Sequence, residues 1–188
     1  TWHEREGGEQ MMPRIKKSWA EEILIVDNHS TDGTIEYANK HGYKIIQQEV
    51  KGRGEAFRVG MRNSSGDILV YFSPDGNEVP EDIPKLIKKI KEGNDMAIAS
   101  RFMKRYRSDD AGLVRGTGHW FFSTLIRILF NSGVRDAVNG YRAIRREVME
   151  DLKTDAQFFE IEIQMTMRCA KRGYKMIEIP TEEPERLE

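Results

Sequence analysis

The sequence predicts an α/β fold built around a mainly parallel sheet. Three observations predict it: short apolar runs alternate with segments of helical pattern, turn or helix-start residues separate them, and polar residues stand directly after several apolar runs. This alternation is typical of a parallel sheet covered by helices, where ligands bind beyond the carboxyl ends of the strands. A chain of 188 residues fits one such domain with a sizeable core.

The expected elements follow one another in strand and helix order, as in a Rossmann-like domain. Strands are expected at 22–27, 43–48, 67–72, 95–100 and 174–180. Helices are expected at 30–42, 54–66, 80–93, 144–152 and 156–171. In the third of these helices, four apolar residues recur on one face: Ile83, Leu86, Ile87 and Ile90.

Composition excludes several classes of function. Thirty basic and 31 acidic residues give a net charge of −1, so we expect no nucleic-acid partner. Cys169 is the only cysteine, which excludes an internal disulfide and a cysteine-based zinc site and fits a reducing compartment. Since no stretch reaches the roughly 20 apolar residues of a membrane span, and the start is not a signal peptide, we expect a soluble, cytoplasmic chain.

Two loops suit a nucleotide. In VDNHSTDGT (26–34), Asp27 ends a strand and is placed to accept hydrogen bonds from a base or ribose. The alternative is an ordinary helix cap by Ser30, Thr31 or Asp32. In KGRGEAFRVG (51–60), backbone amides and Arg53 are placed to face a phosphate at a helix N-terminus, and a tight turn is the alternative.

A third loop, SPDGN (73–77), suits a metal ion. Asp75 stands just beyond a buried strand, where a carboxylate can hold a cation that neutralises a diphosphate. Pro74 and Gly76 also form an ordinary turn signature, so a turn without a ligand remains open. Polar residues at three strand ends are expected to outline one cleft: Asp27 with Asn28, Ser73 with Asp75, and Ser100 with Arg101.

Together these motifs resemble the family-2 glycosyltransferases with the nucleotide-diphospho-sugar (GT-A) fold, in particular the dolichol-phosphate mannosyltransferase and polyprenyl-phosphate glycosyltransferase branch. The matching segments are VDNHSTDGT, GRG (52–54), SPDGN with VPEDIP (73–84), ASRF (99–102) and DAVNGYR (136–142). The resemblance implies one catalytic domain over residues 1–188.

The start, TWHEREG (1–7), is similar to the segment that follows the first strand in this family. We therefore expect that strand to be missing, with truncation at the N-terminus and a shortened C-terminal acceptor-side loop. The resemblance implies that Thr1, Trp2 and Glu4 help to hold the nucleotide, together with Asp27, Arg53 and Asp75, and that residues 8–17 continue as the first helix.

The implied reaction is the inverting transfer of a hexose, of the mannose or glucose class, from a GDP-sugar or UDP-sugar to a polyprenyl or dolichyl phosphate. Mg²⁺ or Mn²⁺ would help the diphosphate to leave. The resemblance makes Asp75 and Asn77 metal ligands, whereas Ser73 stands where the family has a carboxylate. We therefore expect weak metal binding in the absence of nucleotide.

On the acceptor side, the resemblance implies that Arg101 and Arg115 face the acceptor phosphate. Asp136 would position the acceptor or pair with an arginine, and would be the first candidate base if the acceptor were a hydroxyl. The segment 101–130, with its apolar stretch HWFFSTLIRILF, suits a peripheral contact with the cytoplasmic face of a membrane. A buried or homodimer-forming helix is the alternative.

Two other functions stay open. A non-enzymatic module would keep nucleotide-sugar binding and would have lost efficient metal-dependent transfer through Ser73 and the missing first strand. A nucleotidyltransferase of similar sheet architecture explains ASRF and DAVNGYR less well.

Overall fold

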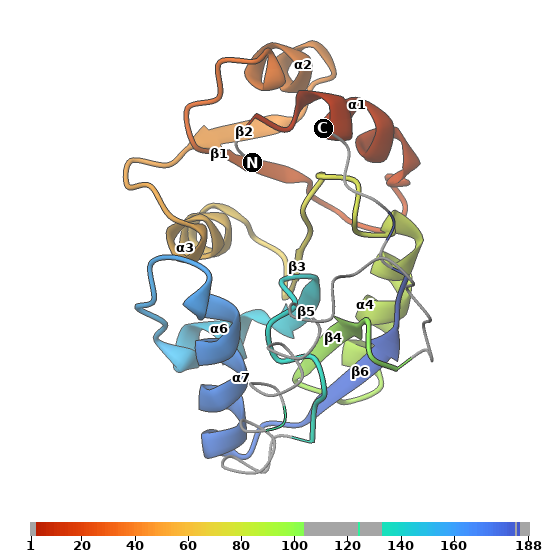
Figure 1. Ribbon diagram of the computed structural model, residues 1–188, viewed down its shortest axis with the longest axis vertical. Coiled ribbons are helices and arrows are strands. Elements are labelled where there is room, and N and C mark those ends of the chain that lie inside the picture. The colour runs from red at the N-terminus through yellow and green to blue at the C-terminus, as the bar shows by residue number, and fades with distance from the viewer. Residues whose placement is uncertain (1–2, 104–123, 125–132, 183, 185–188) are drawn as a thin grey trace.

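The computed structural model describes residues 3–103, 124, 133–182 and 184. In Figure 1 the elements of the first 50 residues lie at the top, above the part of the chain that carries the larger, four-stranded sheet. The helices are α1 (Arg5–Met11), α2 (Thr34–Lys40), α3 (Arg53–Asn63), α4 (Ile83–Lys91), α6 (Arg146–Leu152) and α7 (Glu160–Arg172), with short 3-10 turns at Met12–Arg14 and Pro80–Asp82. The strands are β1 (Leu24–Asp27), β2 (Lys44–Gln47), β3 (Ile68–Tyr71), β4 (Met96–Ser100), β5 (Arg142–Arg145) and β6 (Met176–Pro180).

The strands form two sheets. β1 and β2 pair in parallel, and the second sheet has the order β3-β5-β4-β6. In that sheet β4 and β6 are parallel, but β5 runs antiparallel to both of its neighbours. The prediction of a mainly parallel sheet was therefore wrong for the larger sheet, and the sequence did not predict β5 at all.

The direction of β5 follows from the route of the chain. β4 ends at Ser100, and β5 begins at Arg142, which pairs with Ile98 near that same end of the sheet. A strand that re-enters the sheet where its neighbour left it must run in the reverse direction, because only a crossover to the opposite end gives a parallel pair. The whole sheet is therefore mixed.

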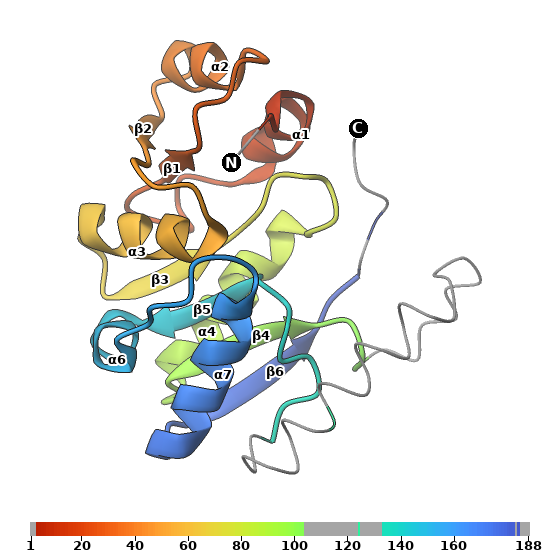
Figure 2. The same cartoon turned by 60° about the vertical axis from the view of Figure 1, so that its left-hand side comes forward.

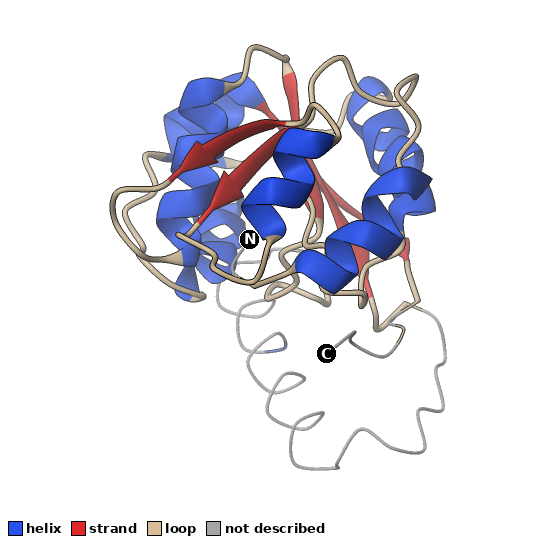
Figure 3. Cartoon of the chain, turned by 90° about the horizontal axis from the view of Figure 1, so that it is seen from above, coloured by secondary structure: helices blue, strands red, loops and turns tan. Residues whose placement is uncertain are grey.

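Helices cover both faces of the larger sheet (Figures 2 and 3). Side chains of β4 alternate between these faces, as a strand requires. Met96 and Ile98 belong to the core shared with α3, α6 and α7, whereas Ala97 and Ala99 belong to the core under α4. The short alanine side chains leave room for α4 against the strand.

The predicted apolar face of α4 is confirmed. Ile83, Leu86 and Ile90 are buried in the core under that helix, and Ile87 is partly buried against the same cluster. Each fully buried aliphatic side chain of this kind contributes about 1.5–3 kcal/mol. The first helix is also present, although it spans Arg5–Met11 and a 3-10 turn in place of the predicted 8–17.

Cys169 lies fully buried on α7 in the core shared with α3 and α6. Burial raises the pKa of its thiol to about 12. We expect iodoacetamide to label Cys169 at pH 8 at least about 100-fold more slowly in the folded protein than in urea, because the thiolate is the reactive form. Mass spectrometry of quenched samples measures both rates, and similar rates would contradict the buried placement.

Among the residues that the structure describes, no helix is long and apolar enough to cross a membrane. The segment predicted to contact a membrane surface, 101–130, lies outside the described residues except for 101–103 and 124. The predicted homodimer contact through this segment likewise stays a prediction.

Candidate functional site

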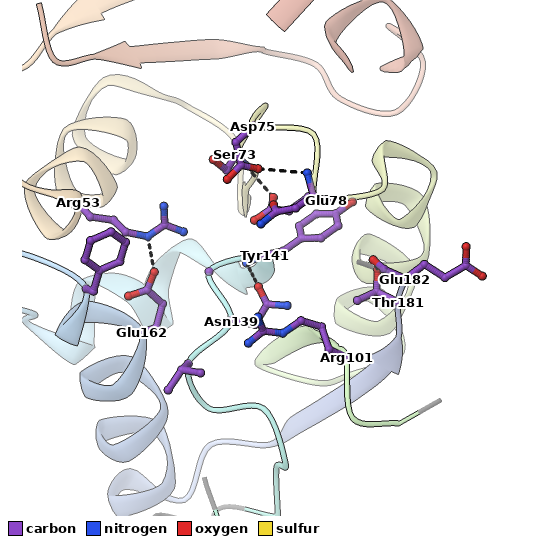
Figure 4. Close-up of a pocket in the computed structure, with 14 residues that line it drawn as sticks. Arg53, Ser73, Asp75, Glu78, Arg101, Asn139, Tyr141, Glu162, Thr181 and Glu182 are labelled. Atoms are coloured by element: carbon purple, nitrogen blue, oxygen red, sulfur yellow. Dashed lines mark hydrogen bonds and ion pairs between the residues drawn. The ribbon is translucent and has the colours of Figure 1, made fainter. Parts of the chain in front are cut away.

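A pocket of about 230 Å³ lies beyond the carboxyl ends of β3 and β4 (Figure 4). The N-terminal ends of α3 and α7, the segment 138–141 and the residues 181–182 after β6 complete its wall. Its charged lining residues are Arg53, Asp75, Glu78, Arg101, Glu162 and Glu182. This is the edge at which a sheet with helical layers offers its loops to a ligand.

The loop after β3 folds back on itself. The Ser73 amide donates to Glu78 Oε2 (2.7 Å), and the Asn77 amide donates to Asp75 Oδ1 (3.3 Å). Between them Gly76 has a φ of 92°, in the left-handed region that favours glycine. The loop is thus a turn, and this turn brings Asp75, Asn77 and Glu78 to the wall of one pocket.

Helix α1 packs closely against this loop. A Cβ on Gly7 would overlap the carbonyl oxygen of Pro74, whereas a Cβ on the next residue, Gly8, would meet only the Tyr37 ring at 3.8 Å. Both glycines are buried in the same short helix. The position of the Asp75 loop therefore depends on the absence of a side chain at Gly7.

Gly7→Ala is expected to destabilise the protein by about 1–3 kcal/mol, because the backbone of the loop must move to admit the methyl group. Gly8→Ala, the matched control, is expected to be neutral or to stabilise by up to about 1 kcal/mol, since alanine favours a helix interior. Urea unfolding of both variants measures the difference. Equal stabilities would contradict the close packing of α1 on the loop.

Arg53, at the start of α3, is held by groups from two other segments, the start of α7 and the loop at Gly140. Its Nε donates to Glu162 Oε1, and its guanidinium lies 5.6 Å from the ring of Phe159. A Cβ on Gly140 would overlap the same guanidinium, so a side chain there would have to displace Arg53 from this position. Burial alone would lower the pKa of Arg53, but the Glu162 carboxylate outweighs it and raises the pKa. Arg53 thus enters the pocket as a fixed positive charge.

The glycines of the GRG loop are required by a close approach of two backbones. The Gly54 amide donates to the Gln157 carbonyl (2.8 Å). Cβ atoms on Gly52 and Gly54 would overlap the carbonyl oxygens of Gln157 and Ala156. This contact fixes the start of α3 against the start of α7, which places Arg53 opposite Glu162.

Arg101 and Asp136 form a two-pronged ion pair. Arg101 Nε donates to Asp136 Oδ2 (2.8 Å) and Nη2 donates to Oδ1 (3.0 Å). Asp136 is fully buried and does not line the pocket, whereas Arg101 does. Of the two predicted arrangements of Asp136, the structure therefore has the pairing with an arginine, and Asp136 orients Arg101 at the pocket wall.

The rest of DAVNGYR connects the parts of the site. Asn139 Nδ2 donates to the Ala99 carbonyl at the end of β4 (2.6 Å), and Tyr141 Oη donates to the Val79 carbonyl after the Asp75 loop (2.8 Å). The buried Arg142 donates to the Glu162 carbonyl on α7 (3.1 Å). One short segment therefore sets the positions of three walls of the pocket.

The residues predicted to contact the nucleotide are divided between two places. Arg53 and Asp75 line the pocket, whereas Asp27 and Glu4 do not. The carboxylate of the buried Asp27 accepts hydrogen bonds from the Ser30 amide (2.9 Å) and hydroxyl (2.6 Å), so it braces the loop before α2. The Asp32 carboxylate accepts a hydrogen bond from the amide of Thr34, the first residue of α2 (3.1 Å). This is the kind of contact that the alternative prediction, a helix cap, requires.

Glu4 lies beside that same loop, because its amide donates to Thr34 Oγ1 (3.2 Å). The N-terminal segment and the loop after β1 are thus adjacent, as the nucleotide prediction requires. Thr1, Trp2 and Arg115 lie outside the described residues. Their predicted contacts with nucleotide and acceptor phosphate stay predictions.

Three acidic residues of the pocket were not predicted from the sequence: Glu78, Glu162 and Glu182. Glu162 is one position after Ile161, which shares a buried helix face with Met165 and Cys169, so helical spacing placed it at the edge of the core. Glu78 follows the metal loop without any such pattern. Its burial depends on the fold of the loop, which spacing alone does not reveal.

The pocket carries more negative than positive charge. With every group ionised, four carboxylates (Asp75, Glu78, Glu162 and Glu182) and two guanidiniums (Arg53 and Arg101) give 2 − 4 = −2, and the sum becomes −1 when Glu78 is protonated. Burial raises the pKa of Glu78 to about 8, and the neighbouring Asp75 and Glu162 carboxylates act in the same direction. A diphosphate would add further negative charge beside these carboxylates. A cation is therefore needed to offset the repulsion between the diphosphate and the carboxylates.

The oxygen donors of the Asp75 loop fit Mg²⁺ or Mn²⁺. These ions prefer carboxylate and amide oxygens and commonly keep positions for water and substrate phosphate. Among the described residues, no group of three or more histidines, cysteines, aspartates and glutamates is close enough to hold a metal by itself. The phosphates of a nucleotide would have to complete the coordination, and weak binding without nucleotide stays a prediction.

Comparison with known proteins identifies the family. The model of "Glycosyl transferase family 2" matches residues 17–153. The chain belongs to this family. Glycosyltransferase AglJ of Haloferax volcanii is 29% identical over 96% of this chain and 60% of its own length. Dolichol-phosphate mannosyltransferase of Pyrococcus furiosus is 32% identical over 96% of this chain and 53% of its own length. This chain thus spans little more than half of these two relatives.

A solved structure supports the α/β GT-A-like fold. Glucosyl-3-phosphoglycerate synthase from Mycobacterium tuberculosis, in complex with Mn²⁺, UDP and glucosyl-3-phosphoglycerate, matches with a TM-score of 0.76. The match covers 100% of this family-2 chain and 70% of the synthase, at 20% identity. Likeness at that identity concerns the fold, so the substrates of this chain must be argued from its own pocket.

Proposed function

We propose that this family-2 chain transfers a hexose, of the mannose or glucose class, from a GDP-sugar or UDP-sugar to a polyprenyl or dolichyl phosphate with inversion. One observation carries the proposal: a single pocket joins the oxygen donors of Asp75 and Asn77 to the guanidiniums of Arg53 and Arg101. Cation ligands beside arginines suit the diphosphate of a donor and the phosphate of an acceptor. The named mannosyltransferase relative supports this acceptor class.

The metal site is part of the proposal. Asp75 and Asn77 would hold Mg²⁺ or Mn²⁺, which when bound neutralises the charge that develops on the departing diphosphate. Arg53, fixed between Glu162 and Gly140, would add a second positive group on the donor side. In the transfer reaction, an oxygen of the acceptor phosphate forms a bond to the anomeric carbon of the sugar. The bond from that carbon to the nucleotide diphosphate breaks at the same time.

Arg101 would orient the acceptor. Its fork is held by Asp136, so the guanidinium keeps one direction at the pocket wall. An acceptor phosphate is already anionic and needs no base to remove a proton. The burial of Asp136 behind Arg101 supports a positioning role for this carboxylate over that of a general base. We place the reaction at the cytoplasmic face of a membrane, where such an acceptor lies.

The test is transfer itself. The chain is incubated with GDP-mannose or UDP-glucose, Mn²⁺ and a short polyprenyl phosphate, and lipid-linked sugar is separated by thin-layer chromatography. We expect product with one of the donors and none without the divalent cation. Nucleotide binding, seen as a rise in the midpoint of thermal unfolding, with no product across donors and acceptors would favour the non-enzymatic binding module.

A further inference from the structure

The buried carboxylate of Glu78 has no role in the function as proposed so far. Its residue is 8% exposed, and it lines the pocket. Within the described part of the chain, its carboxylate takes one hydrogen bond, from the Ser73 amide (2.7 Å), and forms no ion pair with a basic side chain. An ionised carboxylate with so little compensation is costly to bury, so Glu78 favours its ionised form only where a cation from outside the protein compensates it.

The place of Glu78 indicates what that cation is. The hydrogen bond from the Ser73 amide holds the Glu78 carboxylate against the first residue of the loop that also carries Asp75 and Asn77 (Figure 4). The uncharged side chain of Ser73 stands at that point of the wall. A side chain that reaches back to residue 73 brings a second carboxyl group to the end of β3, where residue 73 itself supplies none.

The structure assigns to Glu78 the second carboxylate of the divalent-cation site, in place of an acidic side chain at position 73. This inference rests on the proposed function, because the cation serves a nucleotide diphosphate. Two carboxylates match the charge of Mg²⁺ or Mn²⁺, and Asn77 adds a neutral oxygen. The diphosphate and water complete the coordination, so the loop forms a complete site only with its substrate.

The other two carboxylates of the lining suit this role less well. Glu162 is engaged by Arg53 through Oε1, on the far side of the pocket from the loop. Glu182 is exposed and follows β6, so it belongs to a different segment of the wall. Glu182 is nevertheless useful as a control, because its replacement removes one negative charge from the same pocket without altering the loop.

The experiment measures Mn²⁺ binding to the full chain by electron paramagnetic resonance of the free ion, with GDP or UDP present and without sugar. The variants are Glu78→Gln, Glu182→Gln and Glu78→Gln combined with Ser73→Asp. We expect Glu78→Gln to weaken nucleotide-dependent Mn²⁺ binding at least about tenfold. Glu182→Gln should change it less than about fivefold, as for an exposed charge. Ser73→Asp should restore binding in the Glu78→Gln background.

Each outcome bears on a defined claim. If Glu78→Gln binds Mn²⁺ as tightly as the wild type while Asp75→Asn loses Mn²⁺ binding, the role of Glu78 is overturned and the proposed function stays in place. An equal loss in Glu182→Gln would also overturn it, since general pocket charge would then explain the effect. The absence of Mn²⁺ binding by the wild-type chain with either nucleotide would overturn both. Thermal unfolding of each variant checks that it is folded.

Discussion

Asp75→Asn is expected to lower hexose transfer by about 10²–10³-fold, the effect of removing one group that stabilises developing charge in a reaction of this kind. The amide keeps the size of the side chain and its acceptor oxygen for the Asn77 amide, but removes a negative charge from the cation site. Binding of Mn²⁺ with nucleotide should fall with it. Initial rates of lipid-linked sugar formation at saturating donor measure the effect.

Asp67→Asn is the matched control for this prediction. Asp67 is an exposed aspartate just before β3, whereas Asp75 follows the same strand at its other end. The same chemical change at Asp67 should leave the rate within about twofold, as for a surface substitution away from a site. A rate for Asp75→Asn close to that of the control would remove the metal loop from the proposed mechanism.

Local patterns were enough to predict most elements and the position of the pocket. Apolar runs predicted β1, β2, β3, β4 and β6, because the apolar residues of each of these strands are consecutive or nearly so in the sequence. The polar residues after β3 and β4 were expected to share a cleft, and Ser73, Asp75 and Arg101 do line one pocket. Asp27, the last residue of β1, does not, because within the described part of the chain β1 pairs with β2 in a separate small sheet.

Long-range contacts determine what the sequence did not predict. The strand β5 reads RAIR, with an arginine at each end, and no local pattern marks it as a strand. Arg142 is fully buried there because its guanidinium donates to carbonyl groups of Ala137, Asn139 and Glu162. The sequence contains these partners, but only the folded chain brings the carbonyl of α7 to this strand.

The candidate site shows the same division. The loop chemistry of Asp75 and Asn77 can be read from neighbouring residues, whereas the pairing of Arg101 with Asp136 joins residues 35 positions apart. Glu162 lies 109 positions from Arg53. Motif resemblance identified the segments that carry these residues, and the fold determined which of them face the pocket and which stand behind it.

The ion pair of Arg101 with Asp136 leads to the second large prediction, a loss of stability of about 3–5 kcal/mol in Arg101→Ala. Asp136 is 0% exposed, and its carboxylate accepts hydrogen bonds from Nε, Nη2 and the backbone amide (3.2 Å) of Arg101. Alanine keeps the amide but leaves the carboxylate buried without its cation. Urea unfolding, followed by circular dichroism, measures the free energy of unfolding.

Arg135→Ala is the matched control, because Arg135 is an exposed arginine next to Asp136 and should change stability by no more than about 0.5 kcal/mol. Adding Asp136→Asn to Arg101→Ala should recover part of the loss, since a neutral amide tolerates burial better than a carboxylate. No recovery would mean that lost packing, and not the uncompensated charge, causes the instability.

Arg101→Lys separates stability from function. Lysine keeps the positive charge but loses the forked guanidinium, so the variant should stay close to wild-type stability. It should raise the KM for the acceptor phosphate more than the KM for the donor.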